Sequence, residues 1–76
     1  MAKLARVSGR QMLGFLEGEG FTLVRVRDSH HFLRRGEQRT SVPVHANRPL
    51  KIGTLRSILR DIDMSPHEFE LRMGKG

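Results

Sequence analysis

The chain of 76 residues has no cysteine, no tryptophan and no tyrosine. Without cysteine, a disulfide framework and a thiolate zinc site are both excluded. No apolar run approaches the roughly 20 residues of a membrane-spanning helix, and the N-terminus lacks the apolar stretch of a signal peptide. We therefore expect a soluble, cytoplasmic protein without membrane contact. The short length predicts a single domain over residues 1–76 and excludes a two-domain cleft.

Aromatic side chains are limited to four phenylalanines, most of which we expect in the core. Proteins that read single-stranded nucleic acid by stacking bases on aromatic rings, such as RRM and OB folds, fit this composition poorly. No glycine-rich loop follows a predicted strand and opens a helix, so nucleoside triphosphate chemistry is not indicated.

Acidic side chains are also scarce, since eight Asp and Glu stand against 14 Lys and Arg, a formal net charge of +6. Residues 21–60 hold nine of the cations and only two anions, a local net charge of +7. Most of the cations are arginine, whose planar guanidinium suits phosphate recognition. The charge therefore favours a polyanionic partner such as nucleic acid, with a basic surface kept for solubility as the alternative.

Three helices are predicted from capping signals and apolar periodicity. The first should lie between a capping box of Ser8 with Gln11 and a left-handed cap at Gly20. The second is marked by a stripe of apolar side chains at helical spacing: Leu55, Ile58, Leu59 and Ile62. The last, a short helix, opens with Ser65 as N-cap and Pro66 at the first helical position.

Three strands are predicted between the first two helices, at residues 21–27, 30–34 and 39–44, and tight turns make them an antiparallel meander. Alternation in the first strand places Val24 and Val26 on one face, and Leu23, Arg25 and Arg27 on the other. The fold class is therefore α+β, a three-stranded antiparallel sheet with helices on one face. Its order, α-β-β-β-α with a further short helix, is that of double-stranded-RNA-binding domains.

Histidines are the only side chains here that titrate near neutral pH. His30 and His31 begin the second predicted strand, so they should point to opposite faces of the sheet, and the following hairpin allows His45 to return toward them. Three interpretations of these histidines are open: a metal site, ordinary surface residues, and acid–base catalysis on RNA. A neutral imidazole can remove the proton of a ribose 2′-OH while nearby cations stabilise the phosphate. This chemistry needs no metal, and it does not act on DNA because DNA lacks the 2′-OH.

Three short motifs stand in order along the chain. Gly20-Phe21 leads to Asp28-Ser29-His30-His31, Val42-Pro43-Val44-His45 ends the third strand, and Lys51-Ile52-Gly53-Thr54-Leu55-Arg56-Ser57-Ile58-Leu59 opens the second helix. Together they resemble the motifs of the HicA (YcfA-like) toxins of bacterial toxin–antitoxin systems, over about residues 4–73. One position departs from the family, because Asp28 stands where its members have glycine. Aspartate tolerates left-handed backbone, so we expect the turn to survive.

The resemblance implies a metal-independent endoribonuclease that cleaves mRNA without a cofactor and is neutralised by a HicB-type antitoxin protein. The family's catalytic histidine follows the serine and corresponds to His30, with His31 as second candidate. We expect four further residues to bind RNA phosphates: Arg34, His45, Lys51 and Arg56. No metal and no direct DNA contact are expected. The alternatives are a non-catalytic module that binds structured RNA by shape and an interaction protein whose basic face docks an acidic partner.

Overall fold

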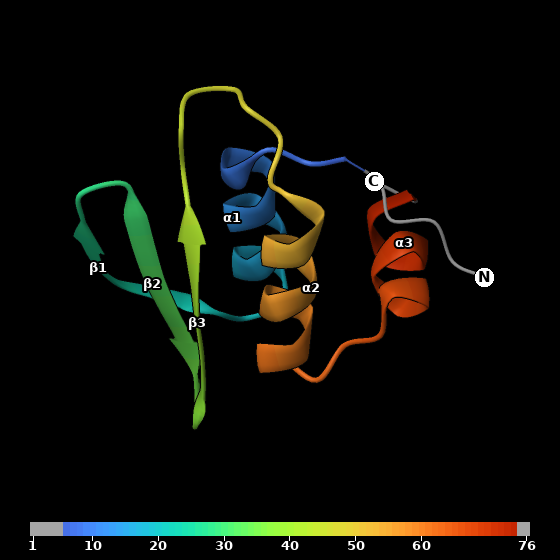
Figure 1. Cartoon of the computed structure of the whole chain (residues 1–76). Helices are drawn as coiled ribbons and strands as arrows, with labels where there is room; N and C mark the ends of the chain where they lie inside the picture. Colours follow the sequence, from blue (N-terminus) through green and yellow to red (C-terminus); the bar gives the residue numbers. More distant parts are fainter. Residues whose placement is uncertain (1–5, 75–76) are drawn as a thin grey trace.

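Three antiparallel strands form a sheet with helices on one face in the computed structural model, which describes residues 6–74 (Figure 1). The elements in chain order are α1 (Gly9–Gly18), β1 (Thr22–Arg27), β2 (His30–Arg35), β3 (Gln38–Pro43), α2 (Ile52–Asp61) and α3 (Pro66–Gly74). Helices α1 and α2 lie next to the sheet, and α3 lies beyond them (Figure 1). This arrangement confirms the predicted fold class.

Both ends of α1 are fixed by the local contacts that the sequence predicts. The Ser8 hydroxyl accepts a hydrogen bond from the Gln11 amide at 3.1 Å, and the Gln11 side chain accepts one from the Ser8 amide at 2.9 Å. At the other end Gly20 has φ 99°, and the Phe21 amide donates to the Leu16 carbonyl at 3.0 Å. That bond is characteristic of a Schellman motif, which satisfies carbonyls left free at a helix end.

Within residues 6–74, twelve buried apolar side chains form the core between the sheet and the helices. They are Val7, Met12, Leu16, Phe21, Leu33, Val42, Leu50, Leu55, Ile58, Leu59, Ile62 and Phe69. All four residues of the predicted second-helix stripe are among them. The rings of Phe15 and Phe69 meet edge to face with centroids 5.0 Å apart, which fixes α3 against α1.

The pairing between β1 and β2 corrects one expectation from the sequence. Leu23 pairs with Leu33 and Arg25 pairs with Phe32, so the register shifts between Leu23 and Arg25. Because Phe32 and Leu33 are neighbours on β2 and point to opposite faces, Leu23 and Arg25 also face opposite ways. The prediction that Leu23 shares a face with Arg25 and Arg27 was wrong, since a bulge adds one residue that simple alternation cannot accommodate.

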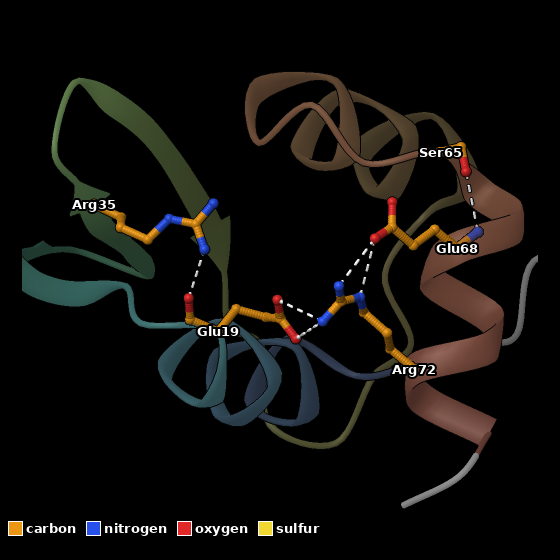
Figure 2. A network of polar contacts seen from close by, with 5 residues as sticks. All are labelled: Glu19, Arg35, Ser65, Glu68 and Arg72. Atoms are coloured by element: carbon orange, nitrogen blue, oxygen red, sulfur yellow. Dashed lines mark hydrogen bonds and ion pairs between the residues drawn. The ribbon is translucent and has the colours of Figure 1, made fainter.

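An ionic network connects α3 to α1 and the sheet (Figure 2). The Arg72 guanidinium donates to the Glu19 carboxylate at 3.0 Å and to the Glu68 carboxylate at 3.1 Å. The hydrogen bond to Glu68 and the charge of Glu19 raise the pKa of Arg72 above its usual value. The Ser65 hydroxyl accepts from the Glu68 amide at 3.0 Å, which confirms Ser65 as the N-cap. From β2, Arg35 donates to the Glu19 carbonyl at 2.6 Å.

Gly9 begins α1 at the place where this helix comes closest to the end of β3. A Cβ atom there would overlap the Pro43 carbonyl oxygen and lie 3.0 Å from Val44 Cα. We expect Gly9→Ala to lower the free energy of unfolding by about 1–3 kcal/mol, because backbone atoms cannot move aside cheaply. Gly14→Ala is the matched control, since a Cβ there meets nothing within 4 Å. It should raise stability by up to about 1 kcal/mol. Urea denaturation measures both, and equal stability of the two variants would contradict the close approach.

Candidate functional site

His30 and His31 lie on opposite faces of the sheet, as predicted. His30 is exposed, and its cross-strand neighbours are Arg27 and Pro43. His31 pairs with the buried Val42 on the side that faces the helices, and it is half-buried. Its Nδ1 atom is buried with no hydrogen-bond partner among the described residues. Of this pair, His30 is therefore the side chain that a substrate on the uncovered side of the sheet can reach.

The turn between β1 and β2 holds His30 in place. Asp28 has φ 56°, the left-handed conformation that a two-residue hairpin needs at its first central position. Aspartate takes up this conformation more readily than most residues, which explains how the turn forms without glycine at this position. The Ser29 carbonyl accepts a hydrogen bond from the Val44 amide at 2.8 Å. This bond ties the turn to the chain leaving β3.

His45 returns to the same turn, as the hairpin geometry suggested. Its Nε2 atom lies 3.5 Å from the Ser29 hydroxyl, at the outer limit of a hydrogen bond. The loop that carries His45 is anchored to the N-terminal segment, where the Leu50 amide donates to the Val7 carbonyl at 2.7 Å. Two imidazoles, His30 and His45, therefore flank Ser29 at one end of the sheet.

A hollow of about 270 Å³ opens beside His45, between the end of β3 and the start of α2. Its lining includes Pro43, His45, Arg48 and Lys51. Lys51 is the N-cap residue of α2, and the first turn of this helix contains no acidic residue. The partial positive charge of a helix N-terminus adds to the two cations, so the hollow favours an anion. The structure thus brings His45 and Lys51 together, and Pro43 borders both the hollow and His30.

The other two residues expected to bind phosphate lie elsewhere. Arg34 shares a face of β2 with His30 but is four residues along the strand, a separation of roughly 13 Å. Arg56 is exposed on α2 and does not line the hollow. Arg34 and Arg56 therefore lie outside the group that the structure brings together around the hollow.

The side of the sheet away from the helices is rich in arginine, and we call it the open face. The strand register assigns it Thr22, Arg25, Arg27, His30, Phe32, Arg34, Arg39, Ser41 and Pro43. None of these residues is acidic, and its four arginines form no ion pair with any residue in the range 6–74. The Arg25 guanidinium lies 4.8 Å from the centre of the Phe32 ring.

Phe32 and Arg39 were not among the predicted site residues. The signal that could have identified Phe32 is its two-residue spacing from His30, which places both on one face of a strand. Arg39 could have been found from the short turn between the second and third strands, which sets it opposite Arg34.

No helix in residues 6–74 is long and apolar enough to cross a membrane. Within the same range, no three His, Asp or Glu side chains stand close enough together to hold a metal ion.

Together these features define a small α+β protein with a cationic, acid-free sheet face and an exposed histidine at its end. The family model for the HicA toxin of bacterial toxin–antitoxin systems matches residues 9–64, which include all three motifs noted in the sequence. The chain therefore belongs to the HicA toxin family, and membership implies an antitoxin partner. Comparisons with curated proteins and with solved structures gave no match.

Proposed function

We propose that this toxin is an endoribonuclease that cleaves mRNA, with His30 as the catalytic base. The observation that carries the proposal is the position of His30, exposed on the open face among arginines and without a carboxylate on that face. A neutral imidazole there can accept a proton, while the surrounding cations stabilise negative charge that develops on a phosphate.

In the proposed reaction, His30 removes the proton from a ribose 2′-OH. The 2′ oxygen attacks the adjacent phosphorus, so that an O2′–P bond forms and the P–O5′ bond breaks. The leaving 5′ oxygen takes up a proton from solvent, and the products are a 2′,3′-cyclic phosphate and a 5′-OH end. The reaction requires neither a metal nor another cofactor. DNA cannot react because it lacks the 2′-OH.

Different cations around His30 bind different phosphates of the RNA backbone. His45 and Lys51, at the hollow next to Pro43, contact the phosphates nearest to His30. Arg34 lies four residues along β2 from His30, so it is placed to bind the phosphate of a neighbouring nucleotide. Arg56 adds positive charge on the exposed side of α2.

Replacing the proposed base tests this function directly. His30→Ala should slow cleavage of RNA by roughly 10²- to 10⁴-fold, the usual contribution of a general base. His67→Ala is the matched control, because His67 is an exposed histidine on α3, and it should cleave at the wild-type rate. His31→Ala should retain cleavage, since His31 faces the helices. Circular dichroism verifies that each variant is folded.

Cleavage at the wild-type rate by His30→Ala would overturn the assignment of the base. Addition of EDTA should leave the wild-type rate unchanged, and a loss of activity would contradict the metal-free reaction. A stable complex of wild-type protein with RNA that stays uncut would instead support the non-catalytic RNA-binding module.

We further propose that a HicB-type antitoxin inhibits the toxin by covering His30 and the open face with acidic groups. A surface with four arginines and no acid attracts a partner of opposite charge. In the complex, His30 should be protected from diethyl pyrocarbonate while the exposed His67 remains reactive, as peptide mass spectrometry would show. The association should also weaken as salt concentration rises. A complex in which His30 reacts as fast as in the free toxin would require another mode of inhibition.

A further inference from the structure

We propose that Phe32 is the platform of a nucleobase subsite, and that the open face therefore takes single-stranded RNA in preference to duplex RNA. The inference rests on the proposed function, because it describes the substrate of the same site. It adds a contact to a base, whereas the proposed reaction itself involves only a ribose and its phosphate.

Phe32 lies in a hollow of the open face, outside the core. The hollow has a volume of about 340 Å³, and its lining includes Val24, Arg25, Arg34 and Arg39. That volume lies within the range of roughly 300–1,000 Å³ found for small-ligand pockets. The Arg25 guanidinium lies over the Phe32 ring, 4.8 Å from the ring centre, so the two groups form one stacked pair against which a planar base can lie. Bases that leave the RNA stack commonly stack on aromatic rings and on arginine guanidinium groups in proteins.

Two arginines at the edge of this hollow indicate that a phosphate binds beside the base. Arg34 and Arg39 are directly opposite each other on β2 and β3. Like charges at such positions destabilise a sheet, and neither arginine has an ion-pair partner among the described residues. A phosphate between the two guanidinium groups would remove that repulsion, so the hollow combines a surface for a base with a site for the backbone.

The spacing along β2 relates this subsite to the proposed reaction. His30 and Phe32 are two residues apart on one face of the strand, a distance of roughly 7 Å. This is comparable to the step between neighbouring nucleotides in an extended strand. A base on Phe32 therefore belongs to a nucleotide next to the one whose 2′-OH meets His30. Duplex RNA keeps its bases stacked inside the helix and cannot offer one to the ring.

An acidic peptide would also neutralise the arginines, but it has no planar group to stack against the Phe32–Arg25 pair. The combination of Phe32, Arg25 and a nearby pair of phosphate-binding arginines matches a nucleotide better, because it serves both the base and the backbone.

A single-stranded RNA decamer, 2′-O-methylated at every ribose and carrying one 2-aminopurine, tests the subsite without cleavage. Stacking quenches 2-aminopurine fluorescence, and a protein without tryptophan or tyrosine adds no interfering emission. We expect wild-type protein to bind the decamer and to quench the probe at one position. Replacing that base with an abasic residue should weaken binding roughly 5- to 150-fold, the contribution of one stacked base. The same decamer in a duplex should bind more weakly.

Protein variants provide the second arm of the experiment. Phe32→Leu should lose the quenching and a similar share of affinity, whereas Phe32→Tyr keeps an aromatic ring and should bind like wild type. Arg25→Gln should weaken binding. Arg60→Gln is its matched control, because it removes one exposed cation from α2 instead of the open face, and it should have little effect. Circular dichroism verifies folding, and the abasic decamer tests the subsite on unaltered protein.

Four results would overturn the inference. Three concern wild-type protein: undiminished binding of the abasic decamer, equal or tighter binding of the duplex, and failure to bind the single strand. The fourth is retained quenching by folded Phe32→Leu. Cleavage of unmodified RNA, measured separately with wild type and His30→Ala, decides the proposed function independently, because a strand can be cut without a base on Phe32.

Discussion

The pairing register of the hairpin between β1 and β2 determines which side chains the sheet presents to solvent. Side chains alternate along a strand, so a slip by one residue would exchange His30 with His31 and turn Leu33 away from the core. The register is fixed at one end by the left-handed Asp28 in the turn and near the other by the bulge after Leu23. The core and the open face therefore depend on the same local constraint.

Because the helices cover only one side of the sheet, the same alternation also divides the arginines of the strands between two environments. Arg34 and Arg35 are neighbours in sequence but have different environments. Arg35 lies on the side of the helices, where it stacks 4.6 Å from the centre of the Phe21 ring and donates to the Glu19 carbonyl. Arg34 stays on the open face without an ion-pair partner in the described chain. A high count of arginines thus serves two purposes, stability on one side and attraction of anions on the other.

Features that depend on local sequence could be predicted, and those that depend on packing between distant segments could not. The cap at Ser8 and the divergence of His30 from His31 follow from spacing alone. The bulge after Leu23 breaks the periodicity on which strand prediction relies. The close approach of Gly9 to β3 depends on how α1 packs against the sheet, and no local pattern in the sequence predicts that packing. The spacing of Phe32 from His30 places both on one face, but which face the helices cover is known only from the structure. Arg34 shares the face of His30 but lies four residues along β2, and its predicted contact with an RNA phosphate stays a prediction.

The proposed cleavage depends most on the transfer of a proton from a ribose 2′-OH to His30. The most direct measurement uses an RNA in which one mapped cleavage position carries a single 2′-deoxy nucleotide and all others remain ribose. Cleavage after this nucleotide should stop, while cleavage at other positions of the same strand continues, each leaving a 2′,3′-cyclic phosphate. Cleavage after the deoxy nucleotide at the rate of the unmodified RNA would contradict this mechanism.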